Sequence, residues 1–347
     1  MADDEKPFWQ NADGIDPAGN AMPHKRFIVI DVWVSLLLCF VLLGHCSFPN
    51  APGWYANEVH TWIYSFHMAA FYFVCGFLVA HSYRPLTDAR SYFSYIGRKV
   101  VKFGTPFLGF GITLCIYHAF VEKGGGLELL KADLQTLFLN PITSPSGYLW
   151  FIYLLLEFYL VAPVFCQFYS WTILPGGMTA ILLCWRPLPS CLCLQLLSRY
   201  LLFFLLGVVA RKHLAGLASV AGKRWGVSIL SCAPPLWLAS IILFAEKHPL
   251  VPALLSLPAL YLIARELSKN KRLAIFCEFL SRRCFAIYLW QMIFIQLLAL
   301  ILFRFCHLPH WCLLMSVIPV GIAVSLLADW AWNAARRRMQ SAFLKTT

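Results

Sequence analysis

The chain has 347 residues, of which 60% are hydrophobic and only 13% are charged, and its mean hydropathy is +0.68. Soluble domains usually carry roughly 25% charged residues, so the composition excludes an ordinary water-soluble globular domain. The formal net charge of +12 does not point to nucleic acid, because the basic residues cluster in short segments between apolar runs. We therefore expect a membrane protein that binds no nucleic acid.

The apolar residues form long continuous runs, which must be helical in a bilayer because each backbone polar group needs a partner within the segment. The sequence therefore predicts an all-α, polytopic integral membrane bundle of about ten transmembrane helices. These cover residues 27–48, 62–80, 103–121, 149–169, 171–185, 190–210, 225–244, 250–265, 284–304 and 311–332. Pro175, followed by two glycines, predicts a broken or re-entrant fifth segment, and Pro252 and Pro258 predict a kink in the eighth.

Basic residues occur in alternate loops, which fixes an orientation by the positive-inside rule. Lys and Arg are frequent in 84–102, 211–224, 265–283 and 336–338, whereas 49–61 contains none. With ten spans, both termini are predicted to be cytoplasmic. We expect a disordered cytoplasmic tail over 1–24, a transmembrane domain over 25–335 and a basic cytoplasmic tail over 336–347, with a helical stretch at 127–139 in the longest loop.

Five polar side chains lie inside the predicted helices, where such groups are costly and mark a functional site by default. They are Asp31, His45, His67, Glu157 and Gln291. In the ten-helix topology His45 and His67 lie at similar depth, in the outer third of the membrane. The alternative is that each side chain only forms a hydrogen bond between helices, and we favour that alternative for His67.

Glu157 lies two turns deeper than Trp150, which enters the membrane from the same outer face. Two histidines and a carboxylate are therefore predicted to converge on one cavity. His45 is the candidate general base, because an imidazole has an ordinary pKa near neutrality. Glu157 or Asp31 is the candidate group that orients the imidazole. Asp31 is the weaker choice, because it lies ~21 Å from His45 along a straight helix, and it is expected to pair with Arg26.

Several segments occur in an order and spacing that is similar to the membrane acyltransferase 3 family. Arg26 is followed five residues later by Asp31 and fourteen residues after that by His45, as is typical of the start of that family. Other segments that are similar to this family are 66–78, 149–163, 203–207 and 282–289. The basic pair 98–99, which precedes a Pro-Phe pair at 106–107, is also similar to it. Together they resemble the branch of sugar and exopolysaccharide O-acetyltransferases.

The resemblance implies an enzyme that moves an acetyl group from cytoplasmic acetyl-CoA to a carbohydrate hydroxyl. It implies acetyl-CoA as co-substrate, with no metal and no permanently bound cofactor, in a bacterial inner membrane. Arg26, Arg98 and Lys99 are candidates to bind the phosphates of acetyl-CoA, and His67 and Trp150 are candidates to bind substrate. The expected partners are the lipid bilayer, acetyl-CoA and the carbohydrate acceptor, with polysaccharide biosynthesis proteins as further candidates.

Two alternatives remain open. Val34 stands where the family usually has a basic residue, so the chain can instead be a catalytically inactive member of a polysaccharide assembly. A transporter or flippase of a glycan or small solute is the other alternative. Separately, Cys306 and Cys312 flank one turn together with His307 and His310, where a disulfide or a metal site is an alternative to free thiols.

Overall fold

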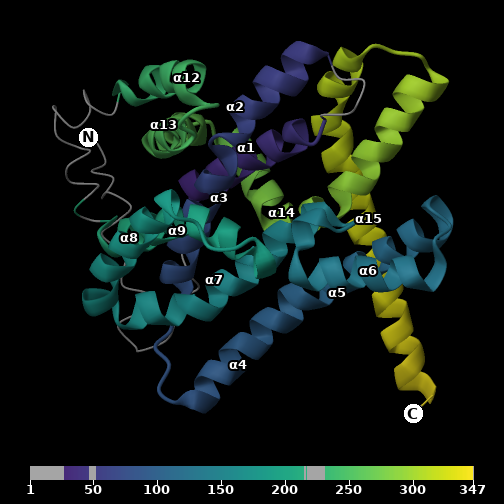
Figure 1. Cartoon of the computed structure of the whole chain (residues 1–347), viewed down its shortest axis with the longest axis horizontal. Coiled ribbons are helices and arrows are strands. Elements are labelled where there is room, and N and C mark those ends of the chain that lie inside the picture. Colours follow the sequence, from purple (N-terminus) through teal and green to yellow (C-terminus); the bar gives the residue numbers. More distant parts are fainter. Residues whose placement is uncertain (1–26, 47–51, 215, 217–230, 347) are drawn as a thin grey trace, which may run out of the picture. The chain divides into compact units, whose positions relative to one another are not determined.

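The computed structural model describes residues 27–46, 52–214, 216 and 231–346 (Figure 1). All regular structure in these residues is helical, which confirms the all-α prediction. The chain divides into two compact units, and the boundary falls inside helix α3 (His67–Ser82). The first unit comprises the described residues from Phe71 to 216, and the second unit comprises those of 27–70 and 231–346. The predicted tail over 1–24 lies outside the described residues.

Seven helices of the described residues are long and apolar enough to cross a membrane. They are Asn57–Ser82, Ala89–Glu122, Gly147–Gln167, Cys191–Lys212, Leu250–Ser268, Lys271–Phe305 and His310–Trp332. Two shorter apolar helices, Ile28–Gly44 and Ala233–Phe244, match the first and seventh predicted spans. A helical membrane bundle is thus supported, while the count of about ten spans stays a prediction.

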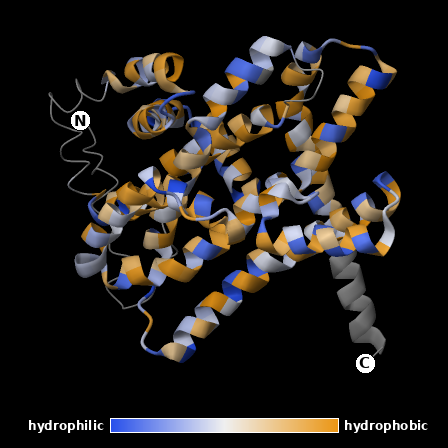
Figure 2. Ribbon diagram, in the orientation of Figure 1, coloured by the Kyte–Doolittle hydropathy of each residue, from blue (hydrophilic) through white to orange (hydrophobic). Residues whose placement is uncertain are grey.

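Hydrophobic residues predominate along most of the helices (Figure 2), and many large apolar side chains are exposed. Trp171, Trp185 and Met315 are 83%, 79% and 76% exposed. A water-soluble protein rarely exposes so much contiguous apolar surface. Lipid chains are the natural partner for such side chains, in agreement with the composition.

The first unit contains a long helix, a shorter helix with two short turns after it, and three packed helices. Its long helix, Ala89–Glu122, joins α4 (Ala89–Lys99), η3 (Val100–Gly104), α5 (Thr105–Tyr117) and η4 (His118–Glu122). The remaining elements are α6 (Gly126–Leu139), η5 (Pro141–Thr143), η6 (Gly147–Leu149), α7 (Trp150–Gln167), α8 (Tyr169–Trp185), η7 (Cys191–Cys193) and α9 (Leu194–Lys212). Helix α7 packs against α4, α8 and α9, and α5 packs against α6.

Two glycines allow α3 and α9 to approach closely in the first unit. A Cβ atom added at Gly76 would lie 2.0 Å from the carbonyl oxygen of Phe204, and one at Gly207 would lie 2.0 Å from that of Phe73. No real side chain fits at such distances. Small residues at helix crossings let backbones pack in membranes, where van der Waals contact replaces the hydrophobic effect.

The second unit is a bundle around α1 (Ile28–Gly44). Its other elements are η2 (Trp54–Val59), α2 (His60–Tyr64), the start of α3, α12 (Ala233–Phe244), α13 (Leu250–Ser268), α14 (Lys271–Leu300), η8 (Ile301–Phe305) and α15 (His310–Thr346). Helix α1 packs against α13, α14 and α15, which explains why it is apolar on all sides. Leu38 and Leu42 of α1 share one buried cluster with Ile287, Ile295 and Val317.

Some local predictions are confirmed and one is wrong. The helical stretch predicted at 127–139 is α6. The predicted break at Pro175 is wrong, because α8 is a single helix with Pro175 inside it. A membrane helix tolerates proline where neighbouring groups satisfy the freed carbonyl. None of the thirteen cysteines, all of which lie in the described residues, forms a disulfide, Cys306 and Cys312 included. The predicted tail over 336–346 continues α15 as helix.

Candidate active site

His45 directly follows the last residue of α1, and two side chains hold the backbone on either side of it. The hydroxyl of Tyr55 donates a hydrogen bond to the carbonyl oxygen of Leu43. Nε2 of His310 donates to the carbonyl oxygen of Cys46 at 3.0 Å. Because a carbonyl only accepts, Nε2 is the protonated nitrogen of His310. These two bonds hold the backbone at the C-terminal end of α1 and thereby position His45.

His45 belongs to a group of rings contributed by α2 and the start of α3. His60 stacks on Tyr64 with 4.1 Å between ring centroids, and Tyr64 meets His67 edge-on at 4.7 Å. Tyr64 also packs on Gly44, where an added Cβ would lie 3.0 Å from its ring. His45 is close enough to His60 and His67 to interact with both electrostatically. The structure therefore brings the two predicted histidines together and adds His60.

His67 has a fixed tautomer. It is 2% exposed, and its Nδ1 donates to the carbonyl oxygen of Ile63 at 2.7 Å. The carbonyl requires a proton on Nδ1, so Nε2 of the neutral ring carries a lone pair. A positive charge on one histidine opposes a charge on its neighbours. Nε2 of His67 is therefore available as an acceptor. We call His45, His60 and His67 the histidine cluster.

Asp31 lies at the opposite end of α1 from the histidine cluster. It is 5% exposed, and the hydroxyl of Ser35 donates both to its backbone carbonyl and to that of Cys277, at 2.9 and 3.0 Å. Because α1 is a continuous helix, the Asp31 carboxylate is ~21 Å from His45 along its axis. Direct orientation of the imidazole by Asp31 is therefore excluded. Arg26, its predicted partner, lies outside the described residues.

Glu157 lies in the first unit, on α7, and one of its carboxylate oxygens, Oε2, is buried without a hydrogen-bond partner. Tyr153 and Cys193 interact with it electrostatically. Leu192 and Cys193 both have the left-handed backbone conformation, with φ of 53° and 54°. Such strain in residues other than glycine clusters at functional sites. Because Glu157 and His45 belong to different units, a joint site stays a prediction.

Trp150 begins α7 and ends a column of stacked aromatic rings in the first unit. Its ring is 6.0 Å from that of Tyr200 at an interplanar angle of 17°, and Tyr200 is 4.9 Å from Tyr72 at 27°. One face of the Trp150 indole is thus covered by Tyr200.

Lys99 and Arg98 end α4, whose first turn is capped by Asp88. The Lys99 ammonium lies 4.2 Å from the ring centroid of Tyr159, on α7, which is the geometry of a cation–π contact. The Arg98 guanidinium is exposed and donates to the hydroxyl of Ser94 at 2.6 Å. The structure therefore places two cations at the end of α4, one against the ring of Tyr159 and one on the exposed side.

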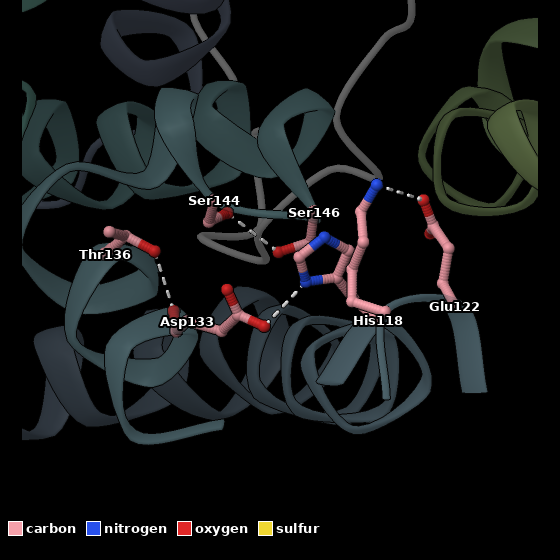
Figure 3. Close-up of polar contacts among 7 residues, drawn as sticks. His118, Glu122, Asp133, Thr136, Ser144 and Ser146 are labelled. Carbon is pink, nitrogen blue, oxygen red and sulfur yellow. Dashed lines mark hydrogen bonds and ion pairs between the residues drawn. The ribbon is translucent and has the colours of Figure 1, made fainter. Parts of the chain in front are cut away.

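A histidine–aspartate pair that the sequence analysis did not single out lies at the other end of the long helix. Nδ1 of His118, in η4, is 2.8 Å from Oδ2 of Asp133, in α6 (Figure 3). The Asp133 side chain is 9% exposed and that of His118 is 23% exposed. Asp133 follows Leu130 by three residues and precedes Leu137 by four, so it lies on the apolar stripe of α6. A carboxylate on that stripe is a signal that sequence analysis could have used.

The roles of four further residues at this site were not predicted. These residues are Tyr55, His60, Tyr64 and His310, which lie at the ends of apolar runs where Trp, Tyr and His are ordinary interfacial residues. Their roles depend on contacts across the fold, such as the one between His310 and Cys46. Within the described residues, no group of three His, Cys, Asp or Glu side chains is arranged to hold a metal ion.

Comparison with known proteins gives one match. A family model described as an acyltransferase domain, of the acyltransferase 3 family, matches residues 28–330. The matched region includes the histidine cluster, Glu157, Trp150 and Lys99. No curated protein and no solved structure matches the chain.

Proposed function

Because the chain belongs to the acyltransferase 3 family, we propose that it transfers an acetyl group from cytoplasmic acetyl-CoA to a hydroxyl of an exopolysaccharide or lipid-linked sugar. The family supports a membrane acyltransferase in general, and the donor and acceptor are our proposal. The observation that carries it is the position of His45, which ends α1 beside His60 and His67 within the matched residues.

The reaction needs a base for the attacking hydroxyl, and His45 supplies it. Its imidazole takes the hydroxyl proton while the sugar oxygen bonds to the thioester carbonyl carbon. The tetrahedral intermediate then collapses as the C–S bond breaks, and the sulfur leaves with the bonding electrons. The imidazolium returns its proton to the sulfur, so that the products are acetylated sugar, the CoA thiol and neutral His45.

Two regions of the first unit are assigned to substrate binding in this proposal. Arg98 and Lys99 attract the phosphates of acetyl-CoA, and the contact of Lys99 with Tyr159 supports a fixed position for one of the two charges. Trp150 is the proposed stacking partner of a sugar ring, on the face of its indole opposite Tyr200. His67 binds substrate through Nε2, and Glu157 is the candidate carboxylate partner of the base.

The proposed setting is a bacterial inner membrane with both termini in the cytoplasm. The alternating basic segments of the sequence support this orientation. In it, Lys99 lies on the cytoplasmic side, where acetyl-CoA is available. Acetyl-CoA is a co-substrate, and polysaccharide biosynthesis proteins are the partners that would supply or export the acceptor.

An inactive member of the family is the second candidate function. Val34, at the position where a basic residue is usual, is 7% exposed and packs within the second unit. An apolar side chain there cannot bind a phosphate or stabilise a developing negative charge. The transporter alternative would be favoured by paired broken helices, and α8 continues through Pro175 as one helix.

The proposal is tested by CoA release from acetyl-CoA with purified protein in lipid, with and without glycan acceptors prepared from cells. The wild type is compared with His45→Ala and with His248→Ala, since His248 is exposed between α12 and α13. We expect acceptor-dependent release that falls by about 10²- to 10⁴-fold in His45→Ala, the usual contribution of a general base. His248→Ala should stay within about twofold of the wild type.

Two outcomes overturn the proposal. If the wild type neither binds nor consumes acetyl-CoA, the inactive-member alternative replaces it. If the wild type is active and His45→Ala retains that activity, an acyltransferase remains but His45 is not its base.

A further inference from the structure

In helix α14, one polar side chain is fully buried and has no hydrogen-bond partner. Gln291 is 0% exposed, and neither its Oε1 nor its Nε2 has a hydrogen-bond partner. A primary amide offers two acceptor sites and two donors, and burying it unpaired is strongly unfavourable. Buried side-chain amides in folded proteins are nearly always paired, so this one points to a partner that the chain itself does not supply.

The position of Gln291 relates it to the half of α1 that ends at His45. Gln291 lies four residues after Ile287 and four before Ile295, so the three share one face of α14. Ile287 and Ile295 belong to the same buried cluster as Leu38 and Leu42 of α1. The amide therefore lies in the interior of the second unit, alongside the part of α1 that leads to the proposed base.

A second unpaired group lies in the same bundle. Ser325 of α15 is 0% exposed and its hydroxyl has no hydrogen-bond partner. It follows Ile322, another member of the buried cluster, by one turn. Helices α14 and α15 are consecutive and pack along each other. Gln291 and Ser325 thus add both donors and acceptors to an otherwise apolar interior, which suits a ligand that also presents both.

We propose that Gln291 binds a secondary amide of the pantetheine arm of the acyl-CoA donor, with Ser325 as an additional polar contact. This inference rests on the proposed function. A secondary amide presents one N–H and one C=O, which pair with Oε1 and Nε2 of Gln291. The pantetheine arm is attached directly to the thioester, so its amides are the polar groups of the donor that would lie nearest to a thioester at His45. Each such hydrogen bond is stronger in apolar surroundings, because no water competes for its donor and acceptor.

The test uses three thioesters of different length: acetyl-CoA, S-acetylpantetheine, which keeps both amides, and ethyl thioacetate, which has none. Full-length wild type in lipid is compared with Gln291→Leu and with Gln296→Leu, a matched change at an exposed position of the same helix. We expect Gln291→Leu to weaken binding of acetyl-CoA and S-acetylpantetheine by about 10- to 100-fold, the usual effect of one lost buried hydrogen-bonding group. Its rate with ethyl thioacetate should be unchanged, and Gln296→Leu should match the wild type throughout.

Thermal unfolding without ligand gives a second readout that does not depend on activity. Gln291→Leu should raise the unfolding temperature, because it removes an unpaired amide from an apolar interior. Added acetyl-CoA should then stabilise the wild type more than the variant. If Gln291→Leu does not fold, Gln291→Met, which keeps the side-chain length, takes its place.

The outcomes separate this inference from the proposed function. Wild type that does not bind acetyl-CoA overturns both. Wild type that binds acetyl-CoA while Gln291→Leu binds it equally well overturns the inference alone, and so does an equal loss with ethyl thioacetate. A lower unfolding temperature for Gln291→Leu would show that the amide has a partner within the protein or a bound water, which also overturns it.

Discussion

His67 and His118 are both partly or fully buried histidines, and each donates from Nδ1 to an oxygen, but the oxygens differ. His67 bonds to the carbonyl of Ile63 at 2.7 Å, beside other histidines, whereas His118 bonds to the carboxylate of Asp133 at 2.8 Å. Opposite charge stabilises an imidazolium and neighbouring like charge opposes it. His118 is therefore paired with a carboxylate, whereas His67 is paired with a neutral carbonyl beside other histidines.

The two regions are therefore expected to have different roles. A neutral imidazole with a free Nε2 can take a proton or accept a hydrogen bond from a substrate, as a reaction requires. A histidine held by a buried carboxylate ties two elements together, here η4 and α6. The chemistry of a histidine in an apolar chain is thus set by its partner more than by its depth. The following substitutions test that assignment, starting with the largest expected effect.

The first prediction concerns His67. In His67→Asn the side-chain amide replaces Nδ1–H as donor to Ile63 but offers no counterpart of Nε2. If His67 binds substrate, the rate of acetyl transfer should fall by about 100-fold, equivalent to ~2.7 kcal/mol, while the unfolding temperature changes little. Transfer is measured with acetyl-CoA and a glycan acceptor. Full activity in His67→Asn would show that His67 serves only as a helix contact.

The second prediction concerns the ion pair of the first unit. Asp133→Asn keeps a hydrogen-bond acceptor for His118 but removes the charge, and the pair is largely shielded from water. We expect the free energy of unfolding to fall by about 2 kcal/mol, with transfer activity within about twofold of the wild type. Detergent-titrated unfolding measures the first quantity. A loss of activity larger than the loss of folded protein would place His118 and Asp133 in the reaction instead.

The sequence was sufficient for features that depend on neighbours along the chain. The apolar runs predicted the apolar helices, although α4 and the start of α14 lay outside the predicted spans. The helical stretch predicted in the longest loop is α6. The close approach of His45 and His67 followed from their similar predicted depth. The family resemblance is confirmed by the match over residues 28–330. The predicted roles of His45, His67 and Glu157 stay predictions.

What the sequence could not predict depends on contacts between distant residues or on backbone strain. The bond from His310 to the carbonyl of Cys46 joins residues 264 positions apart. The positive φ of Leu192 and Cys193 carries no signal in residues that usually avoid it. The prediction of a break at Pro175 was wrong because the rule that proline breaks a helix derives from soluble proteins. Packed membrane helices can continue through a proline.

The third prediction concerns the two bonds that hold the end of α1. His310→Phe and Tyr55→Phe keep ring packing but remove the donors to Cys46 and Leu43. Since His45 then loses its fixed position, we expect kcat to fall by about tenfold in each variant, with KM for acetyl-CoA unchanged. Tyr117→Phe, at a position that is 52% exposed, is the matched control. An increase in KM at constant kcat would show that these residues bind the donor instead of positioning the base.

The smallest effect is expected at the end of α4. Lys99→Gln removes the charge that lies over Tyr159, and KM for acetyl-CoA should rise by about threefold at low salt, equivalent to ~0.7 kcal/mol. The same change at Lys131, which is 72% exposed on α6, should have no effect. Because the interaction is electrostatic, the difference should shrink at about 0.5 M salt, where charges are screened over a few ångströms. Equal KM values for Lys99→Gln and wild type at low salt would contradict donor binding at α4. If KM for acetyl-CoA rose equally in Lys131→Gln, the effect of Lys99→Gln would be due to the change in net charge and not to donor binding at α4.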